Sequence, residues 1–195
     1  MIASVTFKND VRGVFCKGER LEIRPYTLLV GDQGCGKSTL LQAIIGYTRR
    51  SEEERKESSI TIESKGPRLG VAALDFEKDN PRTQGRRLRD DMDTMGQIAS
   101  RFASHGEVVV GLLETMPEKA VLLMDEPDVS LSPRSVYWLS RELRKRAAAG
   151  SQIIVAVHSP ILIEEAGEVL SLEHKRWMPG SEFLELHRTE PKPEP

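Results

Sequence analysis

The chain of 195 residues has few cysteines, little net charge and no long apolar run. Its two cysteines, Cys16 and Cys35, exclude a disulfide framework or a cysteine metal cluster, and they fit a reducing cytosol. No stretch approaches the ~20 apolar residues of a membrane span, and the N-terminus MIASVTFKND becomes polar too early for a signal peptide. We therefore expect a cytoplasmic protein without an intrinsic membrane segment. A net charge of −2 gives no bulk attraction to nucleic acid, although a local basic patch would be hidden in that sum.

Strand-like and helix-like segments alternate along the chain, which predicts an α/β fold with a mostly parallel central sheet and an antiparallel N-terminal part. The expected strands cover residues 4–7, 21–23, 26–30, 60–63, 71–76, 120–124, 153–157, 169–173 and 183–186. The expected helices cover residues 37–46, 86–102, 107–116 and 133–149. Gly46 is expected to end the first helix; Ser132 as N-cap and Gly150 at C′ bound the last. We expect one domain over residues 1–188, with a short helical part at about 80–116, and a disordered tail over 189–195.

Residues 31–39, GDQGCGKST, match the pattern G-x-x-x-x-G-K-[ST] between a strand and a helix. The glycines let backbone N–H groups approach a phosphate, and the helix N-terminus adds partial positive charge. Lys37 is expected to reach the β- and γ-phosphates, and Ser38 to ligate Mg²⁺. The sequence thus predicts a nucleoside triphosphate site. Its expected loop residues are Gly31, Asp32, Gln33, Gly34, Cys35, Gly36, Lys37, Ser38 and Thr39.

A second motif, AVLLMDEPD at residues 120–128, is an apolar strand that ends in two acids. Ligands of open α/β sheets bind at the carboxyl ends of the strands, where these acids are expected to lie. Asp125 is expected to hold Mg²⁺, and Glu126 to orient and activate the attacking water.

These motifs, followed by SLSP at residues 130–133 and by a strand ending VAVHSP with His158, resemble the ABC-type ATPases in kind and in order. The segment SHGE at residues 104–107 looks like the S-x-G-E signature of SMC-like and RecF-like members of that family. The resemblance runs from about residue 2 to residue 173. It implies the fold of a P-loop NTPase head, ATP as nucleotide and Mg²⁺ as cofactor.

The resemblance also implies a division of roles. A second protomer would cover the triphosphate, with Ser104 and Gly106 acting in trans at a helix N-terminus, so that ATP holds two chains head to tail. His158 would contact the γ-phosphate in cis, beside Glu126 and Lys37 as the catalytic residues. The plain alternative for His158 is a strand-end histidine.

Several positions depart from the family pattern or leave two interpretations open. Ser132 stands where many members have an aspartate, and it also suits a helix N-cap. Glu77, as a metal ligand, or Gln84 would replace the usual glutamine of the Q-loop; a solvated loop is the alternative. Arg12 and Phe15 are candidates near the nucleotide, because FKNDVR is similar to the opening strand of SMC-like heads. A plain surface hairpin is equally possible there.

Three functions compete at this point. The leading prediction is an ATP-dependent homodimeric switch that acts on DNA or on a DNA-repair or defence partner. The alternatives are the ATP-binding subunit of an ABC transporter and a slow ATP switch that regulates a partner protein. Arg86, Arg87 and Arg89 would suit DNA phosphates, although the acids at 90, 91 and 93 favour a salt-bridged helix face.

Overall fold

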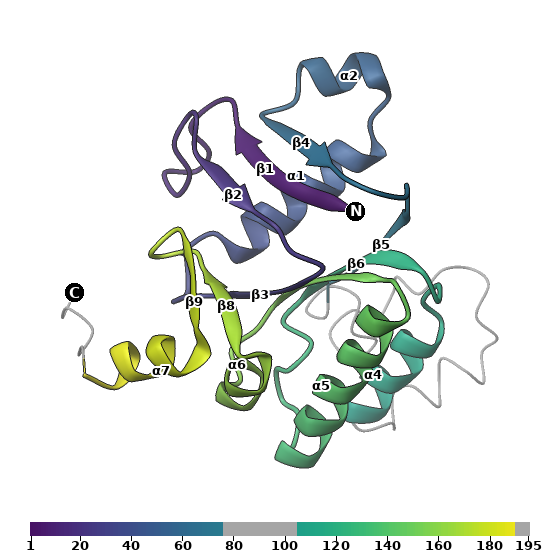
Figure 1. Cartoon of the computed structure of the whole chain (residues 1–195), viewed down its shortest axis with the longest axis vertical. Helices are drawn as coiled ribbons and strands as arrows, with labels where there is room; N and C mark the ends of the chain where they lie inside the picture. Colours follow the sequence, from purple (N-terminus) through teal and green to yellow (C-terminus); the bar gives the residue numbers. More distant parts are fainter. Residues whose placement is uncertain (76–104, 190–195) are drawn as a thin grey trace.

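The protein is described here by a computed structural model that defines residues 1–75 and 105–189. Two sheets organise this part of the chain (Figure 1). A three-stranded antiparallel sheet has the order β2-β1-β4, and a six-stranded sheet has the order β5-β6-β7-β3-β8-β9. Only the β8–β9 pair of the larger sheet is antiparallel among these strands. The predicted α/β class, with its parallel centre and antiparallel N-terminal part, is confirmed.

The strands are β1 Ile2–Phe7, β2 Arg20–Glu22, β3 Tyr26–Val30, β4 Ile60–Ser64, β5 Gly70–Asp75, β6 Ala120–Asp125, β7 Gln152–Ala156, β8 Glu168–Ser171 and β9 Arg176–Pro179. The helices are α1 Lys37–Arg49, α2 Glu52–Lys56, α4 His105–Glu114, α5 Pro133–Ala148, α6 Pro160–Ala166 and α7 Gly180–Thr189.

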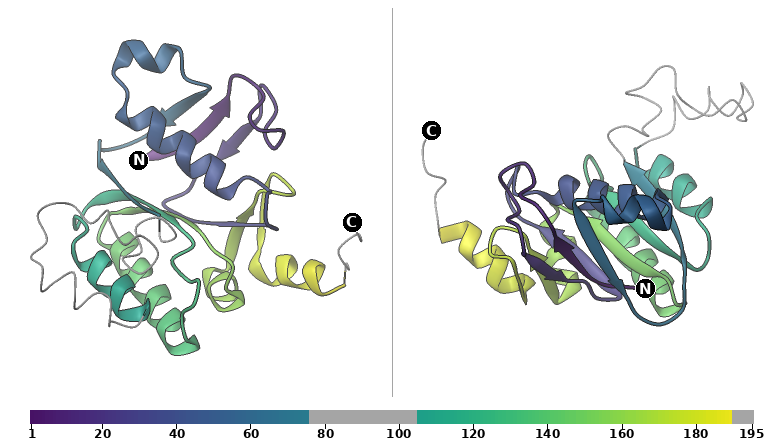
Figure 2. Two further views of the ribbon diagram at one scale, coloured as in Figure 1. Left: turned by 180° about the vertical axis from the view of Figure 1, so that it is seen from behind. Right: turned by 90° about the horizontal axis from the view of Figure 1, so that it is seen from above.

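Alternation along the central strands separates two hydrophobic cores. Leu122 and Met124 of β6 face a core that includes α4, α5 and α6, whereas Val121 and Leu123 face a core that includes α1 and β1. Helices α1 and α5 accordingly lie on opposite sides of the six-stranded sheet (Figures 1 and 2). Because both faces are covered, the central strands are continuously apolar, which is the pattern that identified them in the sequence.

Some boundaries differ from the predictions. Helix α1 does not end at Gly46 but runs to Arg49, because an interior glycine costs only about 1 kcal/mol against alanine and packing outweighs it. The strand expected at 183–186 is wrong: these residues belong to α7, and the antiparallel partner of β8 is β9. Helix α6 was not predicted, although Pro160 at its first position is a typical start.

Other predictions held. β3 spans the residues expected, and Ser132 caps α5 by accepting a hydrogen bond from Ser135 N at 3.3 Å. Gly150 follows that helix at φ 100°, in the left-handed region that favours glycine. The helix expected at 86–102 lies outside the described residues.

One buried amide joins the two sheets. Gln152 Oε1 on β7 accepts the N–H of Ile2 at 2.7 Å, and its Nε2 donates to the Ile2 carbonyl at 2.7 Å and to the Arg24 carbonyl at 3.2 Å. Gln152 is completely buried. Its side chain therefore acts toward β1 as a neighbouring strand would, with both polar ends satisfied.

Candidate nucleotide site

The expected motifs meet at one edge of the six-stranded sheet. β7 lies between β3 and β6, so the loop after β3, Asp125 at the end of β6 and His158 after β7 are neighbours. These three strands are parallel, and their carboxyl ends therefore open on the same side. Strand order thus brings together residues that are up to 127 positions apart, Gly31 and His158 being the extremes.

The loop that leads from β3 into α1 needs glycine for two separate reasons. Gly31, Gly34 and Gly36 have φ of 140°, 88° and 105°, a backbone region costly for other residues. A Cβ on Gly36 would also lie 2.8 Å from Cε2 of Phe15. Phe15 is 1% exposed and stacks on Phe7 with ring centroids 4.1 Å apart.

Phe15 therefore supports the loop from beneath. Phe15 thus lies next to the loop as a buried core residue. Arg12 is exposed in the turn of the hairpin that the Val11–Phe15 bridge closes. Its contact with a nucleotide stays a prediction.

Lys37 is held inside its own loop. Its Nζ donates to the carbonyl of Gly31 at 2.7 Å and to that of Asp32 at 3.3 Å, and the residue is 5% exposed. Gln33, Gly34 and Ser38 are exposed, whereas Thr39 is half-buried. The loop consequently exposes its backbone and the Ser38 hydroxyl to solvent, while the Lys37 ammonium is held beneath them by the loop carbonyls.

Two residues that the sequence did not suggest brace the loop from the side. Glu173, just after β8, accepts the N–H of Asp32, and its Oε2 lies 3.2 Å from Nε2 of His187 on α7. Glu173 Cγ and Cys35 Sγ would lie 3.3 and 2.6 Å from a Cβ on Gly31, so they pack closely on the loop. A signal for Glu173 did exist, because it follows a strand that opens on the same sheet edge.

Cys35 takes part in this packing as a half-buried thiol. Burial is the main cause that raises its pKa, and it outweighs the lowering effect of the nearby Lys37 ammonium. The thiol therefore stays protonated at neutral pH and serves as a packing group of the loop.

Glu126 and His158 form a pair at the sheet edge. Glu126 Oε1 lies 2.8 Å from His158 Nε2, and both side chains are about two-fifths exposed, at 38% and 42%. Glu126 has φ 52°, and its N–H donates to the Ala156 carbonyl at 3.1 Å. The chain turns sharply after β6, which aims the carboxylate at the histidine next door.

Asp128 positions the histidine, and sequence reasoning missed it. Its Oδ2 accepts the backbone N–H groups of His158 at 2.8 Å and of Ser159 at 2.5 Å, and the residue is 6% exposed. Burial raises the pKa of this carboxyl, and the two N–H donors only partly counter it. The sequence did offer a signal: Asp128 is the third acid of DEPD, which follows one strand of the sheet, and the polar residues His158 and Ser159 follow the neighbouring strand.

The structure describes the remaining candidates only in part. Gly106 lies in the first turn of α4, as expected for a signature at a helix N-terminus. Asp125 is the last residue of β6 and is half-buried. Ser104, Glu77, Gln84 and the arginines at 86, 87 and 89 lie outside the described residues.

Comparison with known proteins identifies the family. The chain is 30% identical over 177 residues to the zinc import ATP-binding protein ZnuC of Halorhodospira halophila, a match that covers 80% of this chain and 67% of that protein. The chain belongs to the ABC-type ATPases. A family model described as "AAA domain, putative AbiEii toxin, Type IV TA system" matches residues 107–164 of this ATPase.

Other matches of this ABC-type ATPase are partial. It is 34% identical over 70 residues to a "Putative ABC transporter ATP-binding protein" of Methanosarcina acetivorans, and 22% identical over 210 residues to the ABC transporter ATP-binding/permease protein Rv1747 of Mycobacterium tuberculosis. These alignments span only about a quarter of those relatives, 25% and 24% of their lengths. The fold resembles a nucleotide-free ATP-binding cassette from an ABC transporter, with TM-score 0.62 and 15% identity over 98% of this chain and 97% of that one.

These relatives bear on two earlier predictions. The ABC-type ATPase assignment is confirmed, whereas the finer similarity to SMC-like and RecF-like heads stays a prediction. In the part of the ATPase that the structure defines, no helix combines the length and apolar character needed to cross a membrane.

Proposed function

We propose that the chain binds and hydrolyses ATP and works as the ATP-binding subunit of a transporter, closing as a head-to-tail homodimer around the nucleotide. The observation that carries the hydrolytic part is the convergence of the phosphate loop, Asp125 and the Glu126–His158 pair on one sheet edge. The transporter part was the alternative in the sequence analysis. The named relatives favour it over the DNA-acting switch.

The residues at the loop fit Mg²⁺ chemically. The exposed hydroxyl of Ser38 and the carboxylate of Asp125 are hard oxygen donors, the kind that this ion prefers. We expect these two side chains to hold it, with Glu77 as a further candidate. The ion would supply charge neutralisation at the β- and γ-phosphates.

Each described residue then has a role. The loop N–H groups bind the phosphates, and Lys37, which now contacts the Gly31 carbonyl, supplies positive charge beside them. Glu126 accepts a proton from water while the water oxygen bonds to the γ-phosphorus and the bond to the β-phosphate oxygen breaks. His158, 2.8 Å from Glu126, holds that carboxylate and faces the transferred phosphoryl group.

ATP turnover with Mg²⁺ tests the assignment of Glu126. In Glu126→Gln we expect a loss of at least about 100-fold in rate with ATP binding retained, since general bases contribute about 10²–10⁴-fold. Glu164→Gln, an exposed acid on α6, is the matched control and should turn over like the parent. An unchanged rate in Glu126→Gln would remove Glu126 as the base.

The same Glu126→Gln protein tests the ATP-dependent dimer. Light scattering should show a monomer without nucleotide and a dimer with ATP. Ser104→Ala and Gly106→Val should prevent that dimer, because both residues are expected to act in trans. A monomer at saturating ATP would exclude the head-to-tail assembly.

A second candidate function is the ATP-dependent switch that acts on DNA or on a defence partner. It is favoured by the family model that matches residues 107–164, whose description names a toxin of a type IV toxin–antitoxin system. Duplex DNA added to the ATPase assay separates the two. Stimulation of the rate favours this candidate, and indifference to DNA favours the transporter subunit.

A further inference from the structure

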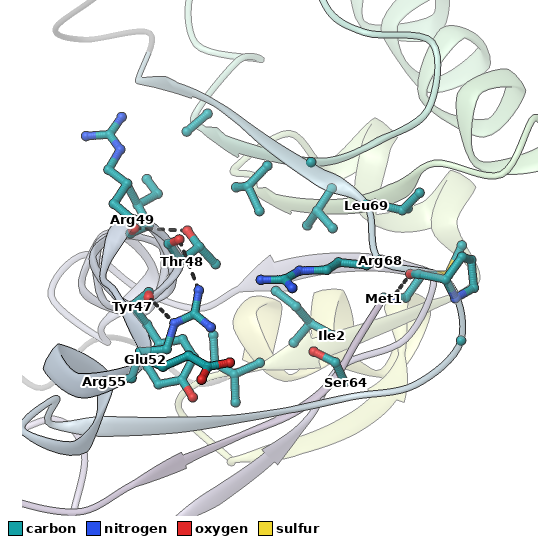
Figure 3. A pocket seen from close by; sticks show the side chains of 18 residues that line it. Met1, Ile2, Tyr47, Thr48, Arg49, Glu52, Arg55, Ser64, Arg68 and Leu69 are labelled. Atoms are coloured by element: carbon teal, nitrogen blue, oxygen red, sulfur yellow. Dashed lines mark hydrogen bonds between the residues drawn. The ribbon is translucent and has the colours of Figure 1, made fainter.

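A cavity of about 560 Å³ lies away from the nucleotide site, between the antiparallel sheet and β5 (Figure 3). It borders the C-terminal end of α1, whose N-terminal end is the phosphate loop; the 13 residues of this helix separate the two by about 20 Å at 1.5 Å per residue. We call it the α1-end pocket. Its apolar lining includes Ile2, Ile45, Ile62, Leu69, Val71 and Val121.

The short helix α2 holds one guanidinium at this pocket. Its sequence EEERK buries no residue, yet a capping box between Ser51 and Glu54 closes its start. At its end, Lys8 Nζ donates to the Lys56 carbonyl at 3.0 Å. Arg55 Nε and Nη2 donate to the carbonyls of Tyr47 at 3.2 Å and Thr48 at 3.4 Å. A guanidinium has five N–H donors, so three remain for another acceptor.

A second guanidinium comes from the loop between β4 and β5. The Met1 nitrogen donates to the carbonyls of Lys65 at 2.9 Å and Pro67 at 3.0 Å and so fixes this loop, and Gly66 turns it at φ 74°. Figure 3 shows the side chain of Arg68 extending from this loop across the pocket toward Arg55. Two arginines from separate elements therefore converge on one space.

Nothing of opposite charge pairs with these two groups in the described parts of the chain. No ion pair joins Arg55 or Arg68 to a carboxylate within residues 1–75 and 105–189, although Glu52 also borders the pocket. Like charges that face each other repel, and an anion between them would reverse that interaction. Guanidinium groups bind carboxylate and phosphate with paired N–H donors.

We propose that the α1-end pocket binds a small organic anion, a carboxylate or phosphate monoester carried on an apolar body. The cavity volume falls within the about 300–1,000 Å³ of small-molecule sites, and a few converging polar groups over an apolar lining are typical of them. The charged head lies between Arg55 and Arg68, and the apolar body lies against the strand side chains. This site is independent of the nucleotide and of the transporter assignment.

Calorimetric titration of the nucleotide-free full chain tests the proposal. The probes are octanoate and octyl phosphate, with octanol and octylamine as the uncharged and cationic counterparts. We expect one equivalent of at least one anionic probe to bind at least about tenfold more tightly than octanol, a factor that corresponds to about 1.4 kcal/mol. The preferred anion then identifies the head group.

Variants locate the binding. Arg68 is exposed, so its replacement should not disturb the fold. Arg68→Gln should weaken binding of the anionic probe at least about tenfold, and Arg68→Lys should restore part of the affinity. Arg20→Gln removes an exposed arginine that pairs with Glu63 on the other side of the antiparallel sheet, and it should bind like the parent. The proposal is overturned if neither anion binds saturably, if octanol binds as tightly, or if Arg68→Gln leaves the affinity unchanged.

Discussion

Removing the carboxylate of Asp128 should cost far more stability than its place in a surface loop suggests. In Asp128→Ala the N–H groups of His158 and Ser159 lose their acceptor, which stands 2.8 and 2.5 Å away in the parent. A buried donor left without a partner costs about 1–3 kcal/mol. Two such donors give about 2–6 kcal/mol, and the exposed side chain of His158 lets water relieve part of that, so we expect a loss of about 2–4 kcal/mol.

Urea denaturation followed by tryptophan fluorescence measures this loss. The matched control is Asp10→Ala, in which an exposed aspartate gives up one backbone bond from Lys17 of 2.7 Å. Water replaces that acceptor, so the control should lose less than about 1 kcal/mol. Asp128→Asn keeps one carbonyl oxygen and should fall between the two. Equal unfolding free energies for Asp128→Ala and Asp10→Ala would refute the claim that Asp128 holds the histidine loop.

Three further outcomes follow from the same contacts. Asp128→Asn should also change the pH dependence of stability. Burial raises the pKa of Asp128, so the folded state keeps this proton to higher pH than the unfolded state does, and the contribution of Asp128 to stability falls as pH rises above about 4. The urea midpoint of the asparagine variant should therefore rise relative to that of the parent between pH 4 and pH 8. A difference between the two midpoints that stays constant with pH would contradict this. Gly36→Ala should unfold about 2–4 kcal/mol more easily in a thermal melt, from left-handed backbone strain and displacement of Phe15, whereas Gly46→Ala in the last turn of α1 should be stabilising. Ser132→Ala should cost about 1 kcal/mol in the same melt, because Ser135 N loses its cap; a cost below about 0.3 kcal/mol would exclude the cap as a stabiliser.

The sequence was informative where one local pattern decides one structure. The apolar runs of β3, β6 and β7 predicted buried parallel strands, and the glycine loop predicted the strand–loop–helix unit whose helix begins at Lys37. Ser132 and Gly150 marked the ends of α5, since a helix cap depends on a few neighbouring residues.

The sequence was least informative where residues far apart decide the outcome. Glu173 and His187 brace the phosphate loop, yet neither lies in a motif, and their contact depends on the pairing of β8 with β3. Residues 183–186, predicted as a strand that closes the sheet, lie within α7, and Phe183 of that helix packs into the core. A short apolar run does not by itself distinguish a strand from a buried helix segment. Asp128 looked like a third loop acid until the fold placed it under the backbone of His158.

The buried amide of Gln152 also sets the order in which this chain can be completed. Its partner Ile2 lies 150 positions away, so the N–H and carbonyl of Ile2 wait for β7, whereas the rest of β1 pairs with the earlier strands β2 and β4. During synthesis at about 5–20 residues per second, that wait lasts of the order of ten seconds or more. In that interval α1 and β4 can already pack on the apolar side of β1, so the last part of this layer to be completed is the pair of polar groups on Ile2.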